Sequence, residues 1–551
     1  MSQSDINEAG AAKGSRGTSV KSMHMSGSDL ARDAEKQDNQ PEPVGLKRQL
    51  KSRHLQMIAI GGTIGTGLFI GSGEAIAKSG PAGALIAYIF VGTIVYSVMT
   101  SLGEMATYMP ISGAFTAYAT RFVDPSLGFA MGWVYWFSWA VTYALELTAT
   151  GLIINYWAPN LSIAIFISVF WVTITLINLL PVSFYGEFEF GLSMVKVVTV
   201  LGFIIFAICI AAGAGQQGVI GFNNWKHPGA FAPYLVGEGP LAKFVGFWAV
   251  LIQAGFSYQG TELVGIAAGE TENPRKNVPA AIKKTFYRIL FFFVVTVFCI
   301  GLLVPYTNKD LLNPSGGTTA AASPFVIAAK LAGVKVLPGI INGVLLFVVI
   351  SAANSNVYSG SRILLGLAKD GSAPAFLKRT TKSGVPIIAV FATSGFGFLA
   401  YLNLSNDGTT VFNWFLDITA VAGFITWGCI NGCHIAFMRA LRARGMDRDT
   451  LPYKAFWEPY FAWYGLFFNV LITITQGFTS FIPWKVSNFF ASYISLILFV
   501  VLFVSHKLIL RTRYVRSLEA DVDTDASKDE DASESIEDPT TAWGRFWAWM
   551  C

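Results

Sequence analysis

The chain has 551 residues, of which 53% are hydrophobic and only 13% are charged. A soluble globular protein carries about 25% charged residues, so this composition excludes a soluble protein and indicates one that crosses a membrane many times. The net charge of +5 is too small to indicate a nucleic-acid partner. Five scattered cysteines and five histidines form no disulfide, zinc or catalytic spacing. We therefore expect no enzyme activity, no metal and no cofactor.

The chain divides into three parts. Residues 1–50 are rich in Ser, Gly, Asp and Gln without apolar periodicity, which predicts a disordered tail. Residues 51–508 form an all-α membrane domain, and residues 509–551 form a second polar tail. Hydropathy predicts twelve transmembrane helices in the domain, near 56–78, 84–108, 126–156, 161–180, 190–213, 243–268, 285–305, 335–354, 386–403, 411–436, 462–482 and 487–508.

Lys and Arg residues orient these spans. They are concentrated in every second loop, for example at residues 275–284 and 439–454, and next to both ends of the membrane domain. Because cytoplasmic loops carry the excess of Lys and Arg, both termini are predicted to be cytoplasmic.

The first span contains the glycine-rich stretch Gly61–Gly71, which is poorly suited to a continuous helix. In hydrocarbon, an interrupted helix is tolerated only where its backbone lines a polar cavity. The sixth span, with small and polar residues over Gln253–Gly265, has the same character. Two interrupted spans five apart indicate two inverted halves and a binding site between them. For the first span alone, close packing of small residues against another helix is the alternative.

The motifs of this chain resemble those of the fungal amino-acid permeases of the amino acid–polyamine–organocation superfamily. The resemblance covers about residues 45–510. It is carried by GGTIGTGLFIG at 61–71, SLGEMA at 101–106, PVSFYGEFEF at 181–190, GTELVG at 260–265, GETENPRK at 269–276 and SAANSN at 351–356. Within that family, YWFSWA at 135–140, LEL at 145–147 and IT at 418–419 look most like the permeases for basic amino acids, arginine and lysine.

The resemblance implies a 5+5 inverted-repeat (LeuT-like) core with broken helices 1 and 6, and proton-coupled uptake of amino acids across the plasma membrane. Helix-start N–H groups would receive the substrate carboxylate, and freed carbonyls would receive its ammonium. The residues concerned are Thr63, Gly65, Thr66 and Gly67 in the first span and Phe256, Ser257 and Gly260 in the sixth.

Ionisable residues inside a membrane are costly and are therefore functional candidates. Glu146 shares a helix face with Ser138 and Thr142, and we predict that it takes part in substrate binding and proton coupling. Lys196 in the fifth span is a second proton-coupling candidate, with a static salt bridge as its alternative.

Three further carboxylates have more than one interpretation. Glu104, near the cytoplasmic end of its span, is interpreted as a structural partner, with a role as a ligand as its alternative. Glu262 contacts either freed backbone, another helix or the substrate. Asp417, beside Thr419, is expected to favour a cationic side chain, unless a shift of one turn places it at the outer end of the tenth span.

The tails suggest regulation. Lys13, Lys21 and Lys36 are candidate ubiquitination sites, which would make a ubiquitin ligase a partner. The acidic segment 518–538 is predicted to be solvated and disordered. Cys551 is a candidate for lipidation and membrane contact.

Two other functions fit the same motifs. One is a broad-range amino-acid permease, and the other is a nutrient sensor that binds amino acids without transporting them. The tail of about 50 residues favours transport, since sensors of this family usually have a much longer one.

Overall fold

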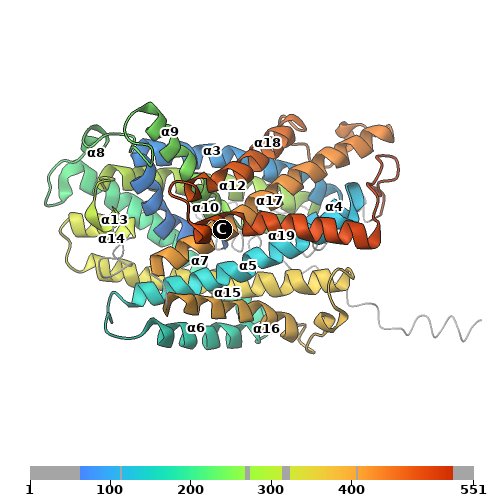
Figure 1. Ribbon diagram of the computed structural model, residues 1–551, viewed down its shortest axis with the longest axis horizontal. Coiled ribbons are helices and arrows are strands. Elements are labelled where there is room, and N and C mark those ends of the chain that lie inside the picture. The colour runs from blue at the N-terminus through green and yellow to red at the C-terminus, as the bar shows by residue number, and fades with distance from the viewer. Residues whose placement is uncertain (1–61, 112–113, 267–273, 313–322, 405–407, 525–551) are drawn as a thin grey trace, which may run out of the picture. The chain divides into compact units, whose positions relative to one another are not determined.

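The structure is a computed structural model that describes residues 62–111, 114–266, 274–312, 323–404 and 408–524. Regular structure in these ranges is helical, apart from one isolated bridge between Phe481 and Trp484 (Figure 1). Lys13, Lys21, Lys36 and Cys551 lie outside the described residues.

The α-helices are α3 Ser72–Tyr108, α4 Ala114–Phe122, α5 Pro125–Ile154, α6 Ile163–Asn178, α7 Val182–Cys209, α8 Asn223–Lys226, α9 Pro240–Ala249, α10 Leu251–Tyr258, α11 Leu263–Ile266, α12 Pro274–Leu303, α13 Lys309–Leu312, α14 Pro324–Leu331, α15 Leu337–Lys369, α16 Ile387–Gly395, α17 Gly408–Ala443, α18 Tyr460–Thr475 and α19 Val486–Leu510. Short π or 3-10 segments are η1 Gly67–Gly71, η2 Ile210–Ala214, η5 Ala375–Lys378, η6 Phe396–Leu404, η7 Arg448–Thr450 and η8 Gln476–Ser480.

Ten helices in the described ranges are long and apolar enough to cross a bilayer, and the apolar helix α6 is shorter. The expected first and second spans form one kinked run, Gly67–Tyr108. Its kink is at Gly80, whose φ of 75° is easily adopted only by glycine. The residues before Gly62 in the first expected span are not described. Twelve crossings and the inverted repeat stay predictions.

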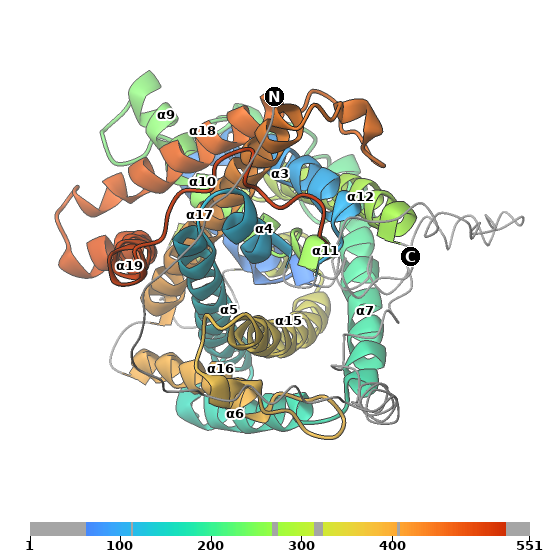
Figure 2. The ribbon, with the colours of Figure 1, turned by 90° about the vertical axis from the view of Figure 1, so that its right-hand side faces the viewer.

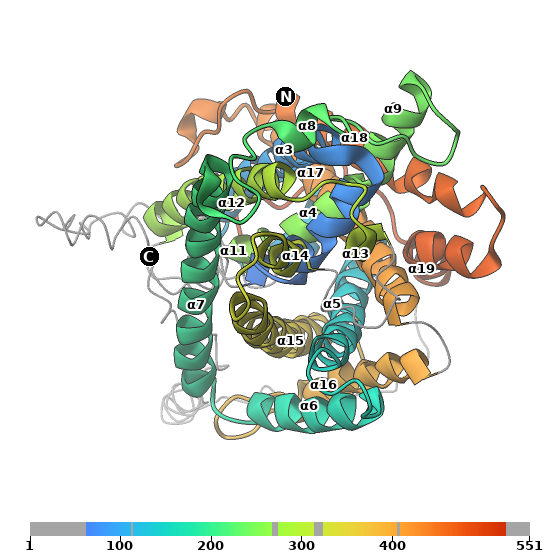
Figure 3. The same cartoon turned by 90° about the vertical axis from the view of Figure 1, so that its left-hand side faces the viewer.

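The interior is built around α5 and α15, which pack along each other and lie side by side in Figures 2 and 3. Helix α3 packs on α12, and α17 packs on α5, α18 and α19. Along α5, nearly every side chain from Ser138 to Ile153 is buried. By contrast, α19 exposes apolar side chains over most of its length, as a helix facing lipid does.

A polar cluster joins α3 to α17 and to the segment that follows it. Glu104 accepts hydrogen bonds from Arg448 and from the backbone N–H of Ala455 (2.8 Å), and its other oxygen lies 2.8 Å from Nε2 of His434. Glu104 and His434 are fully buried. These contacts agree with the structural role predicted for Glu104.

The chain after α19 packs against the protein as far as residue 524. The backbone N–H of Val515 donates to Val123 O at 2.8 Å, and Ala520 and Val522 are buried. Asp523 pairs with Arg444, while Asp521 lies 3.8 Å from Arg121. The prediction for 518–538 is therefore wrong at Ala520 and Val522, which are buried, whereas Leu518, Glu519, Asp523 and Thr524 are exposed as predicted. The ordered packing comes with pairing of the acidic residues to Arg121 on α4 and to Arg444, which directly follows α17.

Candidate functional site

The interruption of the helix over residues 240–266 is visible in the backbone. Helix α10 ends at Tyr258, Gln259 adopts an extended conformation, and Gly260 has a φ of 97° before α11 begins. A Cβ at Gly260 would lie 3.1 Å from the carbonyl oxygen of Gly62. The two glycine-bearing segments singled out in the sequence thus meet backbone to backbone.

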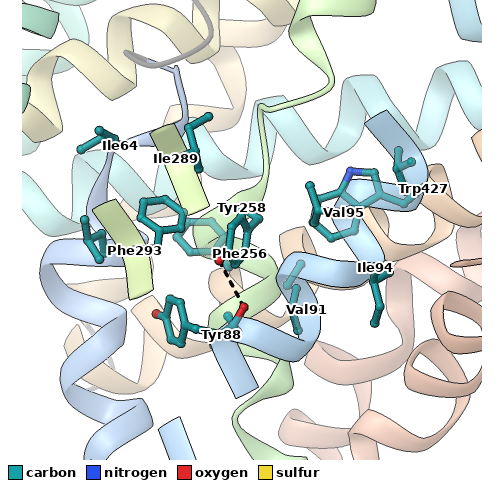
Figure 4. Close-up of a cluster of buried hydrophobic side chains, with 14 of the residues drawn as sticks. Ile64, Tyr88, Val91, Ile94, Val95, Phe256, Tyr258, Ile289, Phe293 and Trp427 are labelled. Carbon is teal, nitrogen blue, oxygen red and sulfur yellow. Dashed lines mark hydrogen bonds between the residues drawn. The ribbon is translucent and has the colours of Figure 1, made fainter. Parts of the chain in front are cut away.

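A second close approach lies one turn away. A Cβ at Gly67 would lie 2.7 Å from the Cα of Ser257, whereas a Cβ at Gly65 would make only an ordinary contact of 3.8 Å with Ala352. Behind this contact, Ser257 Oγ donates to Gln253 O and lies 2.9 Å from the hydroxyl of Tyr88. Tyr258 donates to the backbone oxygen of Tyr88 within the buried aromatic cluster of Figure 4.

A cavity of about 30 Å³ lies between these segments and helices α5 and α15. Its lining includes five residues that the sequence predicted as substrate contacts on the two interrupted spans, and two on α5. These are Thr63, Gly65, Thr66, Gly67, Phe256, Thr142 and Glu146. A cavity of this size holds a water molecule and is too small for a larger ligand in this arrangement of the helices.

Glu146 is the charged side chain in this lining. It is buried, and one carboxylate oxygen accepts a hydrogen bond from Thr66 Oγ1 at 2.8 Å. The other oxygen has no hydrogen-bond partner among the described residues. A buried carboxylate with spare acceptor capacity is suited to receive an ammonium, a guanidinium or a proton.

Lys196 lies on α7 and is completely buried. Its Nζ lies 3.6 Å from Glu189 Oε1, and that oxygen accepts a hydrogen bond from Ser351 on α15 at 2.8 Å. Lys196 therefore has a carboxylate partner on its own helix. Glu189 stands inside one of the motifs quoted above, but sequence reasoning did not single it out.

Glu262 connects the interruption to neighbouring helices. Its carboxylate accepts hydrogen bonds from the Gly260 N–H (3.2 and 3.3 Å), from Tyr135 (3.1 Å) and from Trp427 (3.2 Å). It does not line the cavity. In the structure Glu262 therefore contacts both the freed backbone and neighbouring helices, which are two of the three partners considered for it.

The remaining candidates lie behind or outside the cavity. Ser138 accepts a hydrogen bond from Gln259 at 2.6 Å. Thr419 donates a hydrogen bond to Phe415 O within α17. Asp417 interacts electrostatically with the Glu74–Lys78 ion pair. Neither Asp417 nor Thr419 lines the cavity, and their roles stay predictions.

Five lining residues were not predicted individually: Gly62, Trp139, Gln259, Ala352 and Asn356. Gly62 stands in the glycine-rich stretch of the first span, Gln259 in the interrupted sixth span, and Ala352 and Asn356 in the SAANSN motif, so local signals existed for these four. Trp139 stands in the YWFSWA motif at 135–140 but was not singled out, because a tryptophan in an apolar helix is also an ordinary core residue.

Comparison with known proteins gives a consistent result. The profile of the amino acid permease family matches residues 54–519. The chain is 47% identical to the lysine-specific permease of Saccharomyces cerevisiae over 92% of this chain and 83% of that protein. It is 47% identical to the basic amino-acid permease of the same yeast, over 94% and 91%. It is 42% identical to the proline-specific permease of Emericella nidulans, over 92% and 94%.

Proposed function

The chain belongs to the amino acid permease family, and from this premise we propose that it imports basic amino acids such as arginine and lysine across the plasma membrane, together with protons. The observation that supports this most directly is the meeting of the two interrupted segments at a buried cavity that contains Glu146. Interrupted helices at a repeat interface are the usual means by which transporters bind a zwitterion.

The two ends of the substrate backbone find complementary groups in this cavity. Backbone N–H groups of residues 63–67 point positive dipole ends at the substrate carboxylate. Carbonyls around Phe256, Ser257 and Gly260 would receive its ammonium. Phe256 O and Gly260 O already accept from the N–H groups of Gln259 and Leu263 and have a second lone pair to offer. No resident cofactor is needed, since the binding groups belong to the chain and protons are the coupling ion.

A basic side chain requires a carboxylate in a site of low dielectric. Glu146 has one oxygen without a hydrogen-bond partner and is placed to supply it. The names of the lysine-specific and basic amino-acid relatives support the same preference. Asp417 on α17, outside the lining of this cavity, is a second candidate.

Proton coupling is assigned to Glu146 and to the Lys196–Glu189 pair. A fully buried lysine and carboxylate at 3.6 Å remain charged only while they compensate each other, because an unpaired buried charge is strongly disfavoured. A helix movement that separates them therefore releases or takes up a proton. Alternating access would supply that movement.

Uptake experiments test the proposal. Radiolabelled arginine, lysine, proline, glutamate and leucine are supplied to a permease-deficient yeast expressing the chain, with and without a protonophore. We expect saturable uptake of arginine and lysine that the protonophore abolishes. Similar uptake of all five would establish a broad-range permease, and binding or signalling without uptake would establish a sensor.

A further inference from the structure

A second and larger cavity lies away from the candidate substrate site. Its volume is about 310 Å³, against about 30 Å³ for the cavity around Glu146. It is bounded by the second half of α3, by α12 and by the segment between α17 and α18. The lining residues are Tyr96, Met99, Thr100, Ile282, Phe286, Tyr287, Tyr453, Lys454 and Phe456.

This cavity opens toward the surroundings of the helices. Tyr287 on α12 is 52% exposed and Phe456 is 69% exposed, and both belong to the lining. The stacked pair of Phe456 and Trp457, with ring centroids 5.3 Å apart, lies on the same rim. Exposed aromatic side chains at the end of membrane helices are typical of the headgroup level of a bilayer. In the proposed orientation this is the cytoplasmic leaflet.

The lining is amphipathic. Tyr96, Tyr287 and Tyr453 provide hydroxyl groups and Lys454 provides an ammonium, whereas Met99, Ile282 and Phe286 are apolar. Burial raises the pKa of Tyr453 to about 12, so its hydroxyl stays protonated and can donate a hydrogen bond. The lining contains no carboxylate, which argues against a cationic ligand.

Lys454 is available to a negatively charged ligand. Its Nζ lies 2.6 Å from Asp449, but the two side chains are 44% and 78% exposed. An exposed ion pair of this kind is weak, because water screens both charges. A phosphate would accept hydrogen bonds both from the Lys454 ammonium and from tyrosine hydroxyls. It would therefore replace Asp449, because a charged acceptor with several donors is bound more strongly than one with a single donor.

We propose that this cavity binds a phospholipid of the cytoplasmic leaflet. The phosphodiester lies at Lys454 and the tyrosine hydroxyls, and the glycerol end of the acyl chains lies against Phe286 and Ile282. The three kinds of lining group match the three parts of that molecule. A sterol would use one hydroxyl and leave the ammonium unused, and a soluble phosphate would leave the apolar wall exposed to water.

The floor of the cavity connects the lipid to the packing of the helices. Thr100 donates to Glu458 at 2.7 Å, and the other oxygen of Glu458 lies 3.5 Å from Nδ1 of His434 on α17. A Cβ at Gly103 on α3 would lie 3.0 Å from the ring of Tyr453. A bound headgroup therefore holds the 448–459 segment against α3 and α17.

The test uses the purified full chain and a phosphatidylcholine with a photoreactive acyl chain. Crosslinks are mapped to peptides of α12 and of residues 448–459. Unlabelled phosphatidylcholine and phosphatidylserine compete in separate arms, as do a diacylglycerol with the same chains, a sterol and inorganic phosphate. We expect both phospholipids to suppress the crosslink and the other three to leave it unchanged.

Paired variants complete the experiment. Lys454→Met combined with Tyr287→Phe removes the ammonium and one hydroxyl, and we expect the phospholipid-sensitive crosslink to fall about tenfold. Lys382→Met, at an exposed lysine outside the lining, is the control and should match the parent. Competition by diacylglycerol or sterol equal to that of phospholipid would show a merely apolar crevice. Competition by inorganic phosphate would show a soluble-anion site, and an unchanged crosslink in the double variant would also overturn the proposal.

Discussion

The contact between Gly67 and Ser257 provides a direct test of the site geometry. Gly67→Ala adds a methyl group 2.7 Å from the Cα of Ser257 and 2.8 Å from its Oγ. Carbon atoms in favourable contact are about 3.5–4.0 Å apart, so the two segments must separate by roughly 1 Å. The nearest atom belongs to the backbone of α10 and cannot rotate away.

The magnitude follows from what such a separation disturbs. Overpacking costs about 1–3 kcal/mol. The displaced Ser257 also loses part of its hydrogen bond to the hydroxyl of Tyr88 on α3, which is worth about 1 kcal/mol. We therefore expect Gly67→Ala to destabilise the arrangement seen here by about 2–4 kcal/mol.

Gly65→Ala is the matched control, since its added methyl group would make only an ordinary contact with Ala352 at 3.8 Å. Both variants are compared with the parent for surface expression and for uptake of radiolabelled lysine. We expect Gly67→Ala to lose most uptake at normal surface expression, and Gly65→Ala to keep it. Gly65→Leu should also lose uptake, because the longer side chain extends into a cavity of about 30 Å³. Equal uptake by Gly67→Ala and Gly65→Ala would refute the inferred backbone contact.

Three further predictions concern ionisable residues. Lys196→Met should reduce pH-driven accumulation while leaving exchange of amino acids across the membrane, and undiminished accumulation would give Lys196 a structural role. Glu146→Gln should impair uptake of cationic and neutral substrates alike, whereas Asp417→Asn should weaken arginine and lysine selectively, by about 1–3 kcal/mol; competition assays with one substrate of each kind distinguish them, and the reverse pattern would exchange the two roles. Glu262→Gln replaces a carboxylate that accepts from three groups with an amide that can accept at only one end. We therefore expect a lower thermal midpoint of the purified protein, by an amount corresponding to about 1–3 kcal/mol. An unchanged midpoint would contradict the role of Glu262 in connecting the interruption to neighbouring helices.

The sequence alone determined the membrane class, the helical character and the two segments that carry the site. These features depend on local rules: a bilayer demands long apolar helices, and glycine and polar residues inside such helices mark interruptions. Glu146 and Thr142 were predicted from an ionisable residue inside a span, whereas Thr63, Gly65, Thr66, Gly67 and Phe256 were implied by the family resemblance. All seven line one cavity. The family resemblance, confirmed by comparison, supplied the substrate class that residue patterns do not contain.

Only the tertiary structure decided which ionisable groups meet. Glu262 and Glu146 both lie in glycine-bearing or polar surroundings in the sequence. In the structure, however, Glu262 accepts hydrogen bonds from Tyr135 and Trp427, whereas Glu146 lines the cavity. Lys196 proved to have Glu189 as its partner. The reason is that hydropathy records how apolar a helix is, whereas the partner of a buried charge depends on the rotation and packing of helices from distant parts of the chain.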